Sequence, residues 1–148
     1  MDLRDPTLSA DSVIAALGLV AHPEGGHYRE IWRDAPADGG RGSATSIHFL
    51  LAAGESSHWH RVDADELWVW NAGAPLLLDL SPDGIATTAH LLGPDHGAGA
   101  RLQHVVPRGV WQAARPDGAW TLVSCVVAPA FHFSGFELAP PGWRPGAQ

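Results

Sequence analysis

Residues 54–73 read GESSHWHRVDADELWVWNAG. The segments Ser57–Arg61 and Glu66–Trp70 carry three tryptophans and are separated by a turn region with Asp63 and Asp65, which favours two strands. Side chains two positions apart on a strand face the same way, so we expect His58 and His60 to share one face. Glu66, Trp68 and Trp70 would share a face of the next strand. The stretch therefore predicts an all-β fold with ionisable side chains on its strands.

The same two-residue period continues on both sides of this stretch. Turn-forming residues divide it at Asn71–Gly73, Pro82–Gly84, Pro107–Gly109 and Pro116–Gly118. The other expected strands are Tyr28–Arg33, Ala44–Ala53, Pro75–Ser81, Ile85–Leu92, Arg101–Val106, Val110–Arg115 and Ala119–Ala128. Many short strands at close spacing predict a closed antiparallel barrel or a sandwich.

One helix precedes the strands. Ser9 is a suitable N-cap and Gly18 a suitable C-cap for a helix over residues 9–18, with an apolar stripe between them. The chain has 148 residues, 45% of them hydrophobic, which fits one domain with an ordinary core. We expect a single domain over residues 1–148, with the barrel at about 28–138 and a loose or surface-docked C-terminal tail.

Composition excludes several kinds of function. All nine basic residues are arginine and the formal net charge is −7, so we expect no nucleic-acid partner and no binding to anionic membranes. The absence of lysine excludes a Schiff-base lysine and a phosphate-binding P-loop. The single cysteine, Cys125, excludes an intrachain disulfide and sits in an apolar run typical of a buried position. No membrane span or signal core is recognisable, and we expect a cytoplasmic protein.

His58, His60 and Glu66 allow three interpretations. Two imidazoles and a carboxylate are suitable ligands for a divalent transition metal, and an open three-ligand site is the usual catalytic arrangement. The same side chains could instead perform acid–base chemistry without a metal. In the third interpretation, the histidines are exposed or hydrogen-bonded to neighbouring backbone and have no functional role.

The chain resembles the cupin superfamily. Residues 54–73 are similar to the first cupin motif, and PRGVWQ at 107–112 is similar to the second. More narrowly, the chain resembles a small bacterial and fungal cupin family without a generally assigned reaction. The features that carry this resemblance are PEGGHYRE at 23–30, HRVDADELW at 60–68, VP at 106–107 and WQ at 111–112. The match extends over about residues 17–138.

The resemblance implies a cupin double-stranded β-helix, or jelly-roll barrel, that forms a homodimer and binds a small polar metabolite at its mouth. It also implies a metal set of His58, His60, Glu66 and Gln112 on one divalent ion, Fe, Mn, Ni or Zn. Two departures weaken this metal set. Five residues separate His60 from Glu66, where cupins usually have three or four, and Gln112 replaces the usual last histidine.

Our first functional hypothesis is metal-free or weakly metal-dependent proton transfer, as in an isomerase, epimerase or lyase. His60 would be the base and Glu66 would orient it or share its proton. Tyr28 would be the acid by resemblance to metal-free cupin epimerases, although a core aromatic is an equal interpretation. A divalent-metal-dependent cupin enzyme and a non-enzymatic metabolite-binding barrel are the alternatives.

The expected substrate-binding residues come from several strands. They are His48, Gln103, Gln112, Trp68 and Arg29. Gln103 and Gln112 would hold substrate oxygens, while Arg29 would anchor a carboxylate or phosphate, with a surface ion pair as the alternative. His48 and Trp68 would line the pocket. The Pro23–Gly26 segment would either line the barrel mouth, since its glycines permit close backbone approach, or form a plain turn.

Overall fold

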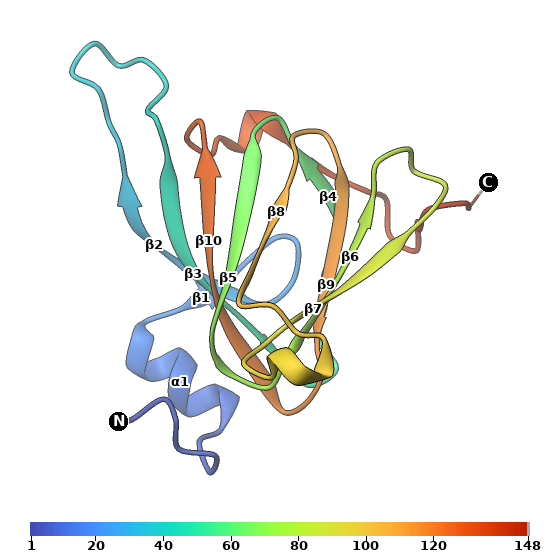
Figure 1. Ribbon diagram of the computed structural model, residues 1–148. Helices are drawn as coiled ribbons and strands as arrows, with labels where there is room; N and C mark the ends of the chain where they lie inside the picture. Colours follow the sequence, from blue (N-terminus) through green and yellow to red (C-terminus); the bar gives the residue numbers. More distant parts are fainter. Residues whose placement is uncertain (148) are drawn as a thin grey trace.

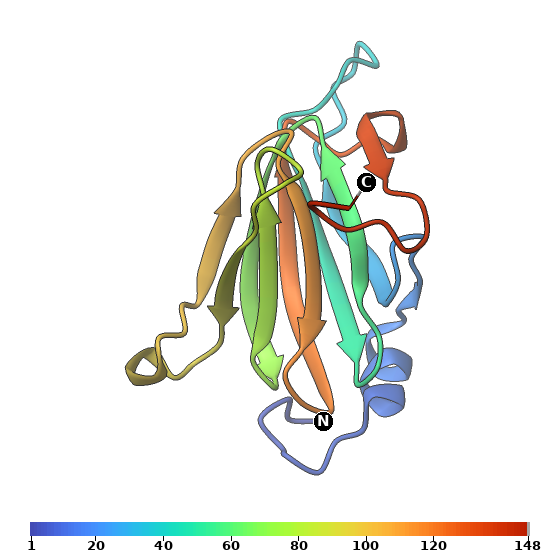
Figure 2. The ribbon, with the colours of Figure 1, turned by 90° about the vertical axis from the view of Figure 1, so that its right-hand side faces the viewer.

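Two antiparallel sheets pack face to face in the computed structural model, which describes residues 1–147 (Figures 1 and 2). The larger sheet has the order β1-β2-β3-β10-β5-β8 and the smaller one β11-β4-β9-β6-β7. The strands of the larger sheet are β1 Val20–Ala21, β2 His27–Arg33, β3 Thr45–Ala52, β10 Trp120–Ala128, β5 Asp65–Gly73 and β8 Gln103–Val106. Those of the smaller sheet are β11 Phe136–Leu138, β4 Ser57–Val62, β9 Trp111–Pro116, β6 Leu76–Ser81 and β7 Thr88–Leu92. This is the jelly-roll barrel that the sequence predicts.

The single α-helix within residues 1–147, α1, spans Ala10–Leu17 and has the predicted caps. The Ser9 side chain accepts a hydrogen bond from the Ser12 N–H, and Gly18 adopts the left-handed conformation that ends the helix. Val13 of α1 is fully buried in a small core with Leu50 and Leu122. The helix thus covers one end of the larger sheet on its outer side and leaves the opposite end of that face uncovered (Figure 1).

Several strand boundaries differ from the sequence prediction, and two short strands were not predicted. Residues 71–73 continue β5 instead of forming a turn, and a register shift beside Leu122 and Val123 of β10 absorbs the irregularity. Strand β7 begins at Thr88 and not at Ile85. The short edge strands β1 and β11 were not predicted, because two or three residues are too few to show a period of two.

The main core fills the space between the two sheets. Its members include Phe49, Trp68, Leu78 and Val123, each at most 1% exposed. Towards one end of the barrel a second group, Val62, Ala64 and Val127, is covered only by Phe131 and Phe136. Val62, Val127, Phe131 and Phe136 of this group line a cavity that opens at this end.

The C-terminal tail lies on the smaller sheet. Ala139 N donates to the Trp59 carbonyl at 2.9 Å, and the Trp143 ring packs against Trp111 with centroids 4.6 Å apart. Of the two alternatives that we expected for the tail, the structure shows the docked one. Within residues 1–147 no helix is both long and apolar enough to cross a membrane.

Candidate active site

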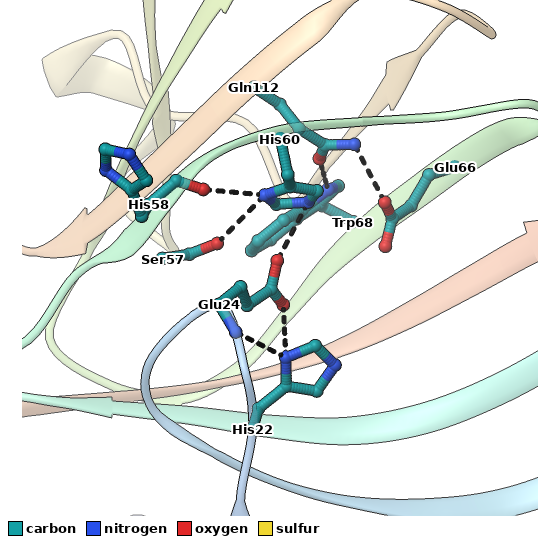
Figure 3. Close-up of polar contacts among 8 residues, drawn as sticks. All are labelled: His22, Glu24, Ser57, His58, His60, Glu66, Trp68 and Gln112. Carbon is teal, nitrogen blue, oxygen red and sulfur yellow. Dashed lines mark hydrogen bonds and ion pairs between the residues drawn. The ribbon is translucent and has the colours of Figure 1, made fainter. Parts of the chain in front are cut away.

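A cavity of about 290 Å³ opens at the end of the barrel opposite α1. Its polar floor is built from the β1–β2 loop, β4 and β5, and its walls come from β2, β3, β10 and the segment before β11. The lining residues are His22, Glu24, Tyr28, Glu30, Arg33, Thr45, Ile47, His60, Val62, Glu66, Cys125, Val127, Phe131, Phe133 and Phe136. Figure 3 shows the polar groups of the floor and the residues behind them.

Two glycines in the β1–β2 loop allow Glu24 to enter the barrel. Gly25 has φ +109°, and a Cβ there would lie 2.1 Å from the Ser56 carbonyl oxygen. Gly26 has φ +74°, and a Cβ there would lie 2.7 Å from the Leu50 oxygen. Only glycine fits this close approach. The His58 N–H in turn donates to the Glu24 carbonyl at 2.8 Å. The loop is therefore pressed onto β3 and β4, and the Glu24 side chain is directed inward.

Glu24 forms a buried ion pair with His60. Their Oε2 and Nε2 atoms are 2.8 Å apart, and the two side chains are only 7% and 2% exposed. His60 Nδ1 lies 2.8 Å from the backbone oxygen of His58. A carbonyl oxygen only accepts hydrogen bonds, so Nδ1 carries a proton. With the carboxylate at Nε2, the geometry is that of an imidazolium with both nitrogens engaged (Figure 3).

The charges of this pair set both pKa values. Burial alone would lower the pKa of His60, but the negative charge of Glu24 and its contact with the ring raise that pKa to about 9. Burial alone would raise the pKa of Glu24, but the charge of His60 holds it below its usual value. Glu24 and His60 are therefore both ionised at neutral pH.

Glu66 is the carboxyl group of the floor that has no cation of its own. Gln112 Nε2 donates to Glu66 Oε1 at 2.9 Å, and Trp68 Nε1 donates to Gln112 Oε1 at 2.8 Å, which fixes the amide orientation. Burial raises the pKa of Glu66 to about 7, against the opposing charge of His60. Burial and the nearby Glu66 also raise the pKa of the Cys125 thiol, so that this thiol is not an activated nucleophile.

His22 adds a neutral imidazole to the floor. Its Nδ1 accepts a hydrogen bond from the Glu24 N–H at 3.1 Å, so the ring proton is on Nε2. Burial lowers the pKa of His22, which keeps the ring neutral. Tyr28 packs edge-on against this ring with centroids 4.6 Å apart. Neither His22 Nε2 nor the Tyr28 hydroxyl has a hydrogen-bond partner within residues 1–147, so both are donors available to a ligand.

The rim of the cavity combines an ion pair with aromatic rings. Arg33 Nη2 and Nε donate to Glu30 Oε1 at 2.7 and 3.1 Å, and Nη1 donates to the Phe131 carbonyl at 2.9 Å. A register shift between Glu30 and Trp32 places both charged residues on the cavity side of β2. Phe131, Phe133 and Phe136 pack edge to face, with centroids 5.0–6.1 Å apart.

His58 does not share a face with His60, so that expectation is wrong. A register irregularity between Ser57 and His60 turns Ser57 and His60 inward and His58 outward. His58 Nε2 instead lies 3.0 Å from the Pro140 carbonyl of the tail. Figure 3 shows the His58 ring directed away from the cluster that surrounds His60. A bulge of this kind breaks the two-residue period on which the expectation rested.

Three predicted substrate-binding residues lie outside the barrel. Arg29 pairs with His48 across the outer face of the larger sheet, and Gln103 is exposed on β8. The Arg29 guanidinium donates to the Leu17 carbonyl at the end of α1. Adjacent strand residues alternate, and Tyr28, Glu30 and Ile47, which neighbour Arg29 and His48, line the cavity instead. Placement of these three residues in the pocket was therefore wrong.

The other predicted site residues are found at or beneath the cavity. His60, Glu66 and Tyr28 line it, as expected. Gln112 and Trp68 are buried directly behind Glu66 and act on its orientation. The structure thus brings His60, Glu66 and Gln112 together.

Sequence reasoning missed Glu24, His22 and Arg33. Glu24 lies in the Pro23–Gly26 segment, in which only the glycines were given a role. A glutamate in a loop gives no sign of burial. The signal was nevertheless present, since two adjacent glycines that permit close approach also permit the preceding side chain to enter the barrel. Arg33 was hidden by the register shift in β2, which no two-residue pattern reveals.

Comparisons with known proteins agree on one family. The family model described as "Cupin superfamily (DUF985)" matches residues 11–139. A crystal structure of a Shewanella oneidensis protein is 42% identical, with a TM-score of 0.84 over 90% of this chain and 85% of that one. A hypothetical protein from Leishmania major is 31% identical, with a TM-score of 0.82 over 92% and 90%. Oxalate decarboxylase from Bacillus subtilis is 12% identical, with a TM-score of 0.62 over 80% of this chain and 29% of that one, a likeness of fold alone. No curated protein matches the sequence.

The side chains at the site do not fit a metal ion. Both His60 nitrogens are engaged, and the Gln112 oxygen already accepts from Trp68. His58 faces the tail. Within residues 1–147, no group of three His, Cys, Asp or Glu side chains has metal-binding geometry. The predicted set of His58, His60, Glu66 and Gln112 therefore does not converge, which corrects our expectation.

Proposed function

This chain belongs to the DUF985 family of the cupin superfamily, and we propose that its cavity transfers a proton to and from carbon in a small molecule, as an isomerase does. Glu66 is the group that takes up and returns the proton. The observation that carries this proposal is a buried carboxyl that faces the cavity, is held by Gln112 and has a pKa of about 7. A general base works best when its pKa is close to the ambient pH.

Glu24 and His60 support this chemistry without exchanging protons with the substrate. The His60 imidazolium is held on both sides, with the His58 carbonyl at Nδ1 and Glu24 at Nε2. A ring in this state has no lone pair with which to accept a proton. His60 is therefore a fixed positive charge that keeps Glu24 ionised, and Glu66 replaces it in the role of base.

The proposed reaction balances with no other reactant. The Glu66 carboxylate takes a proton from a carbon next to a carbonyl, and the electron pair of the broken C–H bond moves onto the carbonyl oxygen to give an enolate. His22 Nε2–H and the Tyr28 hydroxyl are the donors available to stabilise that oxygen. The Glu66 carboxyl then returns the proton to carbon, on the same atom or on a neighbouring one in a conjugated molecule.

Proton exchange in D₂O tests the proposal directly. Acetophenone and 4-acetylbenzoate have methyl protons next to a carbonyl, and NMR follows their replacement by deuterium. We expect the protein to catalyse this exchange for at least one of the two probes, and Glu66→Gln to lose it by about 100-fold or more, the usual contribution of a general base. The matched control is Glu137→Gln, an exposed glutamate paired with Arg61 on the outside of the barrel.

Two results would contradict the proposal. One is exchange by Glu66→Gln at the rate of the unchanged protein. The other is the absence of catalysed exchange with both probes, which favours a metabolite-binding barrel without catalysis.

A further inference from the structure

We propose that Arg33 binds a carboxylate at the mouth of the cavity, so that the substrate is an organic acid with a flat apolar body and a neutral carbonyl at its inner end. The position of the carbonyl rests on the proposed function of Glu66. The binding of the carboxylate by Arg33 does not rest on that function, because it depends on the donors of the rim and the charges of the floor and not on proton transfer by Glu66.

Arg33 has two N–H donors that a ligand carboxylate could use. A guanidinium has five N–H groups, and three are used, two on Glu30 Oε1 and one on the Phe131 carbonyl. One N–H on Nη1 and one on Nη2 therefore have no partner within residues 1–147. Guanidinium N–H groups form strong, charge-assisted hydrogen bonds with carboxylate oxygens. Glu30 and Phe131 fix the plane of the guanidinium.

The floor of the cavity disfavours an anion. Glu24 and His60 neutralise each other at 2.8 Å. Glu66 is therefore the floor group whose negative charge, when it is ionised, has no cation beside it. A ligand anion beside Glu66 would meet a like charge in a buried site, which is costly. Arg33 is the one arginine that lines the cavity, and it lies at the rim. The negative end of a ligand is therefore expected at the mouth and not at the floor.

The wall between rim and floor is apolar. Ile47, Val62, Val127, Phe131 and Phe136 line this part of the cavity. Aromatic rings with exposed edges and faces pack well against flat apolar groups. Phe133 is 54% exposed at the entrance, the exposure expected of a ring that a ligand covers. These features select an unsaturated or aromatic body between the carboxylate and the carbonyl.

A matched pair of compounds tests this inference. In 4-acetylbenzoate, a ring separates the carboxylate from the acetyl group, and 4-acetylbenzamide has the same shape without the charge. Ligand-observed NMR titration gives the affinity of each. We expect the acid to bind about 10-fold or more tightly than the amide, and Arg33→Gln to abolish this difference. Arg115→Gln is the matched control, since Arg115 pairs with Asp79 on the outer side of the smaller sheet.

A second variant tests the same contact in the opposite direction. Glu30→Gln removes the carboxylate that competes for Arg33, so we expect it to bind 4-acetylbenzoate at least as tightly as the unchanged protein. Equal binding of acid and amide by the unchanged protein, no binding of either, or a preference that survives Arg33→Gln would each overturn the inference.

Glu66→Gln separates this inference from the proposed function. It should keep the preference for the acid and lose only the deuterium exchange. If exchange depends on Glu66 but acid and amide bind alike, the rim inference alone is wrong. If acid is preferred through Arg33 but exchange does not depend on Glu66, the proposed function alone is wrong.

Discussion

The inner and outer walls of the barrel carry the same kinds of polar residue in very different states. Adjacent strand residues supply the two walls, as with Tyr28 inside and Arg29 outside. Outside, polar contacts are made singly, such as the 2.7 Å hydrogen bond between Ser124 and Asn71. Inside, they form a connected series, in which Glu24 donates its N–H to His22 and pairs with His60, beside the Glu66–Gln112–Trp68 series (Figure 3).

Two histidines make the contrast measurable. Burial and the nearby Arg29 lower the pKa of His48 on the outer wall. The pKa of His60 is instead raised to about 9, because the charge of Glu24 outweighs an even greater burial. The difference teaches that the charge partner, and not burial alone, decides whether an imidazole of this protein is ionised. Substitutions on the inner wall can therefore be compared with matched substitutions on the outer wall.

The largest expected effect is that of His60→Ala. This substitution leaves the Glu24 carboxylate buried without its cation, so we expect the free energy of unfolding to fall by about 3–5 kcal/mol at neutral pH. His48→Ala on the outer wall should cost less than about 1 kcal/mol. Chemical denaturation of both variants measures the difference.

A double variant identifies the cause of that loss. Adding Glu24→Gln to His60→Ala removes the unpaired charge, so the double variant should be more stable than the sum of its single substitutions predicts. Strict additivity would mean that lost packing, and not charge, explains the effect.

The second effect is a pH dependence due to Glu66. Its pKa rises from 4.5 in the unfolded chain to about 7 in the folded protein. Its contribution to stability is therefore fully present below about pH 4.5 and is lost as the pH rises through about 7, a change of about 3 kcal/mol. Glu66→Gln should remove this loss, as measured by unfolding at about pH 5 and pH 8.

His60 acts in a higher window with the same sign. Its pKa rises from 6.5 to about 9, so the stability that it contributes is lost as the pH rises through about 9. The variant Glu66→Gln should keep this upper decline, while Glu137→Gln on the outer wall should leave both declines in place. A pH profile of Glu66→Gln that follows the unchanged protein between about pH 5 and pH 7 would contradict the raised pKa.

The third effect concerns the loop that directs Glu24 inward. Gly25→Ala places a Cβ 2.1 Å from the Ser56 oxygen at φ +109°, so we expect a loss of about 2 kcal/mol or more and weaker deuterium exchange. Gly39 also has a positive φ, +76°, but a Cβ there would meet nothing within 4 Å. Gly39→Ala should cost only about 1 kcal/mol and leave exchange unchanged. Equal effects of the two variants would show that φ alone matters and that the close approach does not.

Much of the fold follows from the sequence because its signals are local. Turn residues, helix caps and alternating strands act within a few positions, and they predicted α1 and most strands of the barrel. The three residues expected to be catalytic, His60, Glu66 and Tyr28, also line the cavity. His60 and Glu66 were chosen from their resemblance to the first cupin motif, and Tyr28 was chosen because it is the only tyrosine of the sequence.

The rest of the site depends on register, which the sequence does not display. One irregularity in β4 turned His58 outward, and another in β2 placed Arg33 at the rim. The choice of Arg29 and His48 failed for a related reason, because an alternating pattern shows two faces but not which one is inside. The prediction of His60 as the base did not take account of Glu24, which was not predicted to be buried and which fixes the charge of His60.

The smallest expected effects are those of Arg29→Gln and Gln103→Ala on the outer wall. Arg29 makes one long hydrogen bond of 3.3 Å to Leu17, and Gln103 is exposed, so each substitution should change stability by less than about 0.5 kcal/mol. Neither should alter deuterium exchange or the preference for 4-acetylbenzoate, because both side chains lie on the far side of the sheet from the cavity. These two residues were our sequence-based choices for substrate binding. A change in either readout would restore that choice and show that the outer wall communicates with the site through β2 or β8.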